Sequence, residues 1–348
     1  MKTLEKNKKI DDRAISDALD LNGAQVETLA DNERKKHERA YERIRSCLGE
    51  VFCSVDDDPT VIAIMLNPDT RLWVDKLGAG MSCVGEISAP RSKAAMRVIA
   101  GLLNKELTAD TPFFDDYIPW NGARLAVQIP PIVENTTFAI RKRAISVFTL
   151  AQYVEDGVLS QIHYNKILDL IQGRKNILVV GSTNSGKTPL TNALINEISV
   201  LDSESRILIM DDTGEIQCTA KNKVLFKTSG AVHYQELLQT SLRMRPDWII
   251  VGEVRSHVAL DILDAWNTGH EGGICTMHAN DAEQALLRLE SLINRNTYAP
   301  KDVKEVIAQA VDAIIFIRKT PEYGRKIEQI LLIDGYDRDT GRYRYNVC

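Results

Sequence analysis

A single eight-residue segment, GSTNSGKT at residues 181–188, narrows the possible folds of this chain more than any other. It fits the pattern G-x-x-x-x-G-K-[ST] in full, it follows the apolar residues 176–180, and a helical pattern comes after it. Such a loop needs a strand before it and a helix behind it, because backbone N–H groups and the helix N-terminus must converge on the same phosphate groups. The segment therefore predicts an α/β fold that binds a nucleoside triphosphate.

The residue types in this loop suit phosphate binding. Gly181 and Gly186 allow the backbone to curl so that its N–H groups point inward. Lys187 supplies a point charge to the β- and γ-phosphates, and the Thr188 hydroxyl is expected to bind Mg²⁺. Pro189 is unusual, but a first helical turn tolerates proline because an N–H there has no intrahelical acceptor. The candidate nucleotide-binding residues are Gly181, Ser182, Thr183, Asn184, Ser185, Gly186, Lys187, Thr188 and Pro189.

The domain that carries the loop is expected to span residues 146–348. Short apolar runs in it alternate with helical patterns, which predicts a parallel sheet covered by helices on both faces. The expected strands are 176–180, 206–210, 248–251 and 273–277, and the expected helices are 189–198, 234–242, 258–266 and 282–293.

The preceding part of the chain has a different pattern. Residues 46–145 indicate a smaller α+β domain, and residues 1–45 a polar leader in which acidic and basic side chains alternate at helical spacing. The expected elements of the smaller domain are strands at 61–66, 71–74 and 124–129 and a helix at 90–105.

Composition excludes several classes of protein. With 44% hydrophobic and 26% charged residues, the 348-residue chain resembles an ordinary globular protein of about two domains rather than a disordered one. No apolar run approaches the ~20 residues of a membrane-spanning helix. The six cysteines are scattered without a CxxC pair, so we expect reduced thiols and no zinc site. A net charge of −5 disfavours direct nucleic-acid binding, which would need a local basic patch.

Acidic residues follow two of the expected strands. Asp211, Asp212 and Glu215 come after residues 206–210, and Gly252 and Glu253 come after residues 248–251. Because carboxyl ends of parallel strands form the ligand edge of an open sheet, we expect Glu215 to orient and deprotonate the attacking water. A glycine occupies the usual Walker B aspartate position, so Glu253 is expected to act on Mg²⁺ through water.

Structural explanations remain open for some of these residues. Asp211 and Asp212 suit turn and helix-cap chemistry, and Glu253 could form an ion pair with Arg255. His278 follows a third expected strand, where it is either a γ-phosphate sensor or a structural histidine. No cysteine or histidine lies at metal-ligand spacing from His278, so a protein metal site there is not expected.

Taken together, these motifs resemble the secretion ATPases, the motors of type II and type IV secretion and of type IV pili. The resemblance rests on residues 181–188, DDTGE at 211–215, MRPDWIIVGEVR at 244–255 and ICTMHAND at 274–281, in that order. The glycine before Glu253 is characteristic of that superfamily. Segments such as TVIAIMLNPDTRLWVDKL at 60–77 are most similar to its TrbB-type conjugal transfer ATPases of type IV secretion. The likeness covers about residues 35–345, with departures at Pro189, usually threonine, and at Asp211, often glutamate.

The resemblance implies a homo-hexameric ring in which each subunit holds ATP and Mg²⁺ between an N-terminal domain and a RecA-like C-terminal domain. It implies that arginines of the N-terminal domain reach the phosphates, and by position the candidates are Arg124 and Arg141. From spacing alone, both are expected to be solvated arginines. The implied partners are inner-membrane components of a type IV secretion or conjugation system, with a peripheral location at the cytoplasmic face of the membrane.

Two other classes of nucleotide-dependent protein were weighed against this motor. A GTPase switch shares the D-x-x-G pattern of Asp211 and Gly214, but the chain has no N-K-x-D segment to bind guanine. A RecA-like motor that translocates nucleic acid is disfavoured by the net charge and by an aromatic content of 6%. The sequence therefore predicts an ATP-hydrolysing motor of a secretion or pilus-assembly apparatus.

Overall fold

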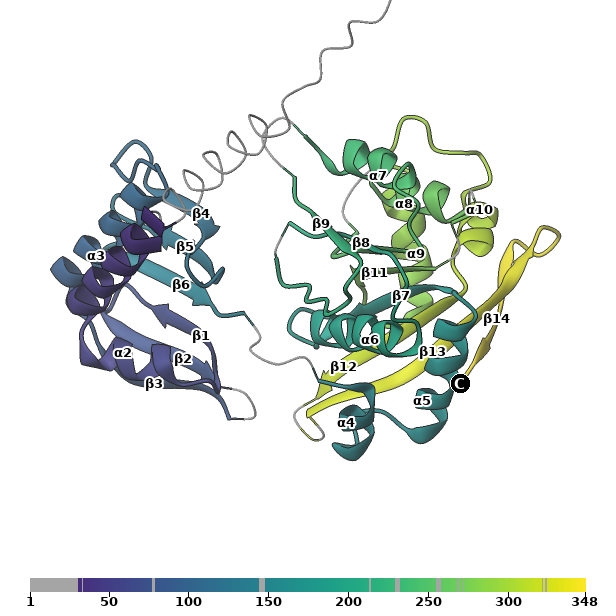
Figure 1. Cartoon of the computed structure of the whole chain (residues 1–348), viewed down its shortest axis with the longest axis horizontal. Helices are drawn as coiled ribbons and strands as arrows, with labels where there is room; N and C mark the ends of the chain where they lie inside the picture. Colours follow the sequence, from purple (N-terminus) through teal and green to yellow (C-terminus); the bar gives the residue numbers. More distant parts are fainter. Residues whose placement is uncertain are drawn as a thin grey trace, which may run out of the picture. The chain divides into compact units, whose positions relative to one another are not determined.

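The computed structural model describes residues 31–32, 34–76, 79–143, 148–212, 214–228, 232–254, 258–267, 269–270, 272–320, 322 and 324–348. Most of the predicted leader, Thr213 and Arg255 lie outside these residues. Contacts divide the chain into two compact units, Met1–Arg143 and Ala144–Cys348 (Figure 1).

The first unit is built on a six-stranded antiparallel sheet with the strand order β3-β2-β1-β6-β5-β4. Its elements are a helix over residues 34–48, α2 (Glu50–Asp57), β1 (Val61–Leu66), β2 (Arg71–Lys76), β3 (Gly80–Glu86), α3 (Ala89–Leu102), β4 (Phe113–Tyr117), β5 (Arg124–Gln128) and β6 (Thr137–Arg141). Alternate residues of a strand point to opposite faces, so Leu125 and Val127 of β5 are buried while Arg124 is exposed. Ile44 and Leu48 join the same core, so the helix over 34–48 packs on this unit.

The second unit is an eight-stranded sheet with helices on both faces. The strand order is β14-β13-β12-β7-β11-β10-β8-β9, and the pairs from β12 to β9 are parallel. Its elements are α4 (Leu150–Glu155), α5 (Gln161–Gln172), β7 (Asn176–Gly181), α6 (Lys187–Leu201), β8 (Ile207–Met210), β9 (Lys223–Phe226), α7 (Tyr234–Leu242), β10 (Trp248–Val251), α8 (Val258–Asn267), β11 (Gly273–His278), α9 (Ala282–Ile293), α10 (Val303–Ala310), β12 (Ala313–Thr320), β13 (Gly324–Asp337) and β14 (Arg342–Val347).

The sequence predicted four of the parallel strands, β7, β8, β10 and β11, but neither the parallel strands β9 and β12 nor the antiparallel extension. β13 and β14 pair antiparallel with β12 and with each other, so the sheet is mixed. Buried residues of α4, α5 and α6 form the core on one face, and those of α8, α9 and α10 form it on the other (Figure 1). Because both faces are covered, every residue of β7 is buried and its sequence is a continuous apolar run after Asn176.

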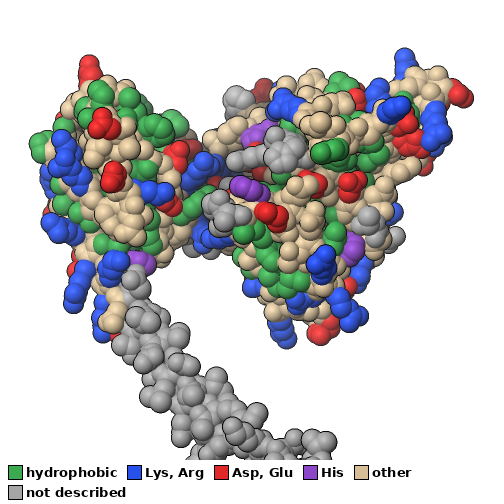
Figure 2. Space-filling model, turned by 90° about the horizontal axis from the view of Figure 1, so that it is seen from above, with side chains coloured by type: hydrophobic (Ala, Val, Ile, Leu, Met, Phe, Trp, Pro, Cys, Tyr) green, Lys and Arg blue, Asp and Glu red, His purple; other side chains and the backbone are tan. Residues whose placement is uncertain are grey.

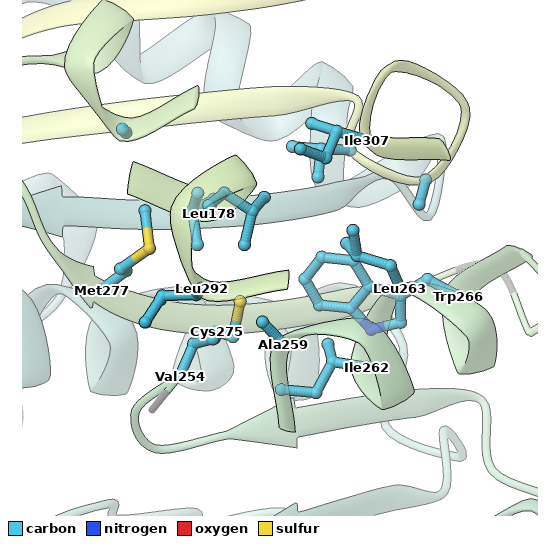
Figure 3. Packing of buried hydrophobic residues seen from close by; sticks show 14 of the residues in the cluster. Leu178, Val254, Ala259, Ile262, Leu263, Trp266, Cys275, Met277, Leu292 and Ile307 are labelled. Carbon is cyan, nitrogen blue, oxygen red and sulfur yellow. The ribbon is translucent and has the colours of Figure 1, made fainter. Parts of the chain in front are cut away.

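The core between the sheet and α8, α9 and α10 interlocks closely (Figure 3). Leu178 from β7 and Cys275 and Met277 from β11 face side chains of the three helices. Trp266 of α8 lies flat against Gly273, where any Cβ would collide with the indole ring. Gly273 is thus required by packing rather than by its backbone angles.

The surface charges, the cysteines and the hydrophobicity of the helices can be compared with what the composition indicated. On the face drawn in Figure 2, acidic and basic side chains are interspersed on both units. All six cysteines are free thiols. Within the described residues, no helix is long and apolar enough to cross a membrane.

We expect Gly273→Ala to destabilise the second unit, because the added methyl group displaces the Trp266 indole. Overpacking of this kind costs about 1–3 kcal/mol. The measurement is the midpoint of urea unfolding followed by tryptophan fluorescence. Gly101→Ala is the control, since a Cβ there meets no atom within 4 Å. A Gly273→Ala midpoint equal to that of the wild type would contradict this packing.

Candidate active site

The loop between β7 and α6 is shaped by its two glycines. A Cβ at Gly181 would collide with the Ile317 carbonyl oxygen and the Ser185 hydroxyl. Gly186 is the N-cap of α6 with a φ of 105°, a left-handed conformation that disfavours other residues. The loop therefore bends where the sequence motif requires it to bend.

The start of α6 presents backbone donors to this loop. The first intrahelical bond runs from the Leu190 N–H to the Gly186 carbonyl, at 3.0 Å. The N–H groups of Gly186, Lys187 and Thr188 precede it and have no acceptor within the helix, and Pro189 has no N–H. Together with the helix dipole, three donors at one point favour an anion.

Lys187 is held inside the loop. Its side chain is only 8% exposed, and its ammonium group donates to the carbonyl oxygens of Gly181 at 3.1 Å and Ser182 at 2.9 Å. The Lys187 Nζ also lies 3.2 Å from His278 Nδ1. Because an ammonium group can only donate, His278 Nδ1 must accept this bond, and the ring proton belongs on Nε2.

His278 connects Lys187 to an acidic residue on a third strand end. Its Nε2 lies 3.3 Å from Glu253 Oε1, within ion-pair distance of the carboxylate. The register of the sheet explains the approach, because His278 pairs directly with Gly181 at the ends of β11 and β7. Lys187, His278 and Glu253 thus form one chain of close polar contacts at the carboxyl ends of the parallel strands.

Steric hindrance by Asp211 explains why the residue before Glu253 is a glycine. A Cβ at Gly252 would lie 2.7 Å from Asp211 Oδ1, so the Asp211 carboxylate occupies the space that a Walker B side chain would need. Asp211 is 5% exposed, and its other oxygen, Oδ2, accepts the Ile216 N–H at 2.8 Å. Asp211 therefore fixes the turn after β8 and, through Gly252, the course of the chain into Glu253.

Glu215 follows this turn, and the buried side-chain amide of Asn192 on α6 holds its backbone in place. Asn192 donates its side-chain N–H to the Glu215 carbonyl at 3.1 Å and accepts the Gln217 N–H at 2.9 Å. Both bonds involve the backbone, so they position the segment around Glu215 without using its carboxylate. Asp212 has a separate structural contact, since its Oδ1 accepts the N–H and hydroxyl of Thr228.

Comparisons with known proteins assign the chain to a family. Residues 81–332 match the family described as Type II/IV secretion system protein. The probable conjugal transfer protein TrbB of Sinorhizobium fredii is 40% identical over 309 residues, which cover 89% of this chain and 94% of that relative. The chain belongs to the type II/IV secretion system protein family. The predicted resemblance to TrbB-type secretion proteins is thereby confirmed.

Solved structures of secretion proteins share the fold of this family member. The ATPase DotB of Legionella pneumophila matches with a TM-score of 0.61 at 16% identity, covering 83% of this chain and 80% of its own. The pilus retraction motor PilT, solved with bound ADP, matches with a TM-score of 0.56 at 18% identity, covering 83% and 79%. The predicted fold class, a RecA-like α/β domain with a smaller α+β domain before it, is confirmed.

Most of the candidate residues of this secretion-family chain lie in the second unit, around the loop. Ser182, Thr183 and Asn184 are exposed at its tip, whereas Ser185 is fully buried and its hydroxyl has no partner among the described residues. Within those same residues, no group of three or more His, Cys, Asp or Glu side chains could hold a metal ion. A cation at this loop would therefore depend on the Thr188 hydroxyl and on the bound phosphates for ligands.

Arg124 and Arg141 belong to the first unit, where they are direct cross-strand partners on β5 and β6. Both side chains are exposed. Residues opposite one another on an antiparallel pair share a face, and like charges in that position repel. The two arginines that the family resemblance singled out thus form one cationic pair, which spacing alone did not reveal.

Sequence reasoning missed two residues beside the loop of this secretion-family chain. Asn192 carried a weak signal, because a buried asparagine within an apolar helix needs hydrogen-bond partners. Arg325, on β13, packs against Gly186, and nothing in its sequence context signalled this. It lies 136 positions beyond Pro189 in the chain and reaches the loop only through strand pairing.

We expect Gly252→Ala to destabilise this secretion-family chain by about 1–3 kcal/mol, because its methyl group enters the space of the Asp211 carboxylate. The cost should shrink in an Asp211→Gly background, where that space is open. Urea unfolding of the four proteins in the cycle measures the coupling. Strictly additive effects would show that the two residues do not compete for one position.

Proposed function

We propose that this secretion-family chain hydrolyses ATP with Mg²⁺ and works as a homo-hexameric motor of a type IV secretion or conjugative transfer apparatus. The observation that carries the proposal is the chain of contacts from Lys187 through His278 to Glu253 at the glycine-bent loop. A charged donor, a titratable relay and a carboxylate meet where the helix N-terminus already favours phosphate. Family membership supports the ATPase assignment.

Lys187 has partners that a triphosphate can replace. Its contacts with two carbonyl oxygens and a neutral imidazole satisfy the ammonium group within the loop. Anionic phosphate oxygens form stronger charge-assisted bonds, so nucleotide binding draws Lys187 toward the β- and γ-phosphates. His278 Nδ1 then loses its donor, and the imidazole becomes available to sense the γ-phosphate while Nε2 remains beside Glu253.

The remaining roles follow from the strand ends. Thr188 would hold Mg²⁺ and Glu253 would act on it through water, and the cation, when bound, would supply charge neutralisation to the phosphates. Glu215 orients the attacking water and accepts its proton, on a segment that Asn192 holds to α6. Fixing the Glu215 backbone limits the motion of its carboxylate, which matters because catalysis depends on pre-set geometry.

The paired arginines of the first unit would couple nucleotide binding to a conformational change. Arg124 and Arg141 present two guanidinium groups from directly opposite strand positions, and two adjacent guanidinium groups suit an anionic phosphate. An arginine that contacts the phosphoryl group during its transfer increases the rate of hydrolysis by roughly 10³–10⁵-fold. Binding of ATP would then favour the state in which the arginines reach the phosphates, and release of phosphate would disfavour it. A ring with closed head-to-tail contacts would transmit this change between subunits.

The proposed setting comes from the relatives. The Sinorhizobium fredii relative is a probable conjugal transfer protein, and PilT is a pilus retraction motor. We place this chain by analogy at the cytoplasmic face of the inner membrane, in peripheral contact with membrane components of its apparatus. Direct nucleic-acid binding is not part of the proposal, because the net charge is −5.

We expect Glu215→Gln to keep nucleotide binding and to slow ATP hydrolysis by about 10²-fold or more, because the amide cannot accept the proton of water. Phosphate release and ADP affinity are measured on the same preparation. Lys187→Ala is the matched comparison and should lose both properties. If Glu215→Gln fails to bind nucleotide, Glu215 is structural, and unchanged turnover in Lys187→Ala would refute the site.

We expect Arg141→Ala to lose hydrolysis by roughly 10³-fold while the oligomer still assembles. The two readouts are phosphate release and the mass of the particle with ATP and Mg²⁺. Arg97→Ala serves as the control, since it removes an exposed arginine from α3 of the same unit. Normal activity of Arg141→Ala would remove this residue from the proposed site.

A further inference from the structure

Arg325 lies against the phosphate-binding loop at Gly186. It is the second residue of β13 and pairs with Lys319 of β12. A Cβ placed at Gly186 would lie 2.9 Å from Arg325 Cδ and 3.1 Å from its Nε. The arginine stem therefore packs on the N-cap of α6, within the unit that holds the loop.

The Nε of Arg325 has no acceptor among the residues that the structure describes. This atom is buried, and no carboxylate in the described part of the chain lies within ion-pair distance of the guanidinium group. A buried N–H without an acceptor costs free energy, so such a group needs a partner or an explanation. Tyr153 of α4 feels the charge of Arg325, and burial raises the pKa of its phenol to about 12 despite that opposing charge. A neutral phenol does not neutralise a guanidinium.

The loop, in turn, lacks one donor. The first four N–H groups of a helix are those without intrahelical acceptors, and in α6 the fourth position is Pro189. Only Gly186, Lys187 and Thr188 can donate there. Pro189 belongs to the first turn of α6, and Arg325 packs on the N-cap of that same turn.

The surrounding hairpin is also electropositive. Arg318, Lys319, Arg325 and Lys326 lie on adjacent β12 and β13, and in Figure 1 the end of this hairpin lies beside α4 and α6. Arg318 pairs with Glu328 at 3.6 Å. Lys319 and Arg325 raise the local affinity for an anion beside the loop.

We propose that Arg325 binds the α-phosphate of the nucleotide and supplies the donor that Pro189 lacks. The inference rests on the proposed function, since it assumes that the loop binds a nucleoside di- or triphosphate. A guanidinium suits this position because its planar donors can reach a phosphate oxygen while its aliphatic stem packs on Gly186. An α-phosphate contact is present with both ADP and ATP, so Arg325 is a positioning residue that sets affinity rather than the rate of hydrolysis.

The test measures binding of Mg·ADP and Mg·tripolyphosphate to the full chain by calorimetry. We expect Arg325→Ala and Arg325→Met to weaken both ligands by about tenfold or more, as for loss of a charge-assisted bond. Arg325→Met keeps the packing on Gly186, so it separates loss of charge from loss of fold. Lys326→Ala removes the adjacent basic side chain on the other face of β13 and should shift affinity by no more than about threefold.

The decisive variant restores the missing donor. Pro189→Thr in the Arg325→Ala background should recover most of the lost affinity, because the two donors serve one phosphate, and a purely structural role of Arg325 would give no such rescue. In steady state, Arg325→Ala should raise KM for ATP with little change in kcat.

Other binding results distinguish failure of the Arg325 contact from failure of the nucleotide site. Unchanged ADP binding by Arg325→Ala and Arg325→Met, with binding lost in Lys187→Ala, overturns this inference and leaves the proposed function standing. Weakened ADP binding with unchanged tripolyphosphate binding overturns the α-phosphate contact and assigns Arg325 to the base or sugar. Full binding by Lys187→Ala would instead refute the nucleotide site itself.

Discussion

The pairing of β7 with β11 is the constraint on which the site depends. It sets Gly181 directly opposite His278, so that the end of one strand begins the phosphate-binding loop and the end of the next carries an imidazole beside it. Lys187 can then satisfy its charge on its own loop and on that ring. A register shift of one residue would turn His278 to the other face of the sheet and would break the contact with Glu253 as well.

The local sequence pattern was sufficient to predict individual strands, helices and the loop, but it did not predict contacts between residues that are far apart in the chain. The loop, the strands at 176–180 and 248–251 and the helix at 282–293 are visible in sequence because apolar periodicity and glycine placement act over a few residues. The competition between Asp211 and Gly252 is not visible, because it arises where two parallel strands end side by side. Arg325 is hidden for the same reason, since only the order of β7, β12 and β13 brings it to the loop.

The arginine pair of the first unit shows what a family resemblance adds. Composition and spacing gave no reason to connect Arg124 with Arg141, which are separated by a turn and by most of two strands. Antiparallel pairing of β5 with β6 makes them neighbours on one face of the sheet. The resemblance selected the residues, and the register explains why they lie side by side.

The order of strands in the eight-stranded sheet has a consequence for solubility. Its two outermost strands, β9 and β14, are edge strands. The unpaired backbone N–H and C=O groups of an edge strand can form hydrogen bonds with a strand of another chain, which leads to aggregation. β9 begins with a lysine, and β14 contains Arg342 and Arg344, so cationic side chains flank both open margins. Stacking two such margins would bring like charges together. These like charges disfavour edge-to-edge pairing of the sheets of two copies.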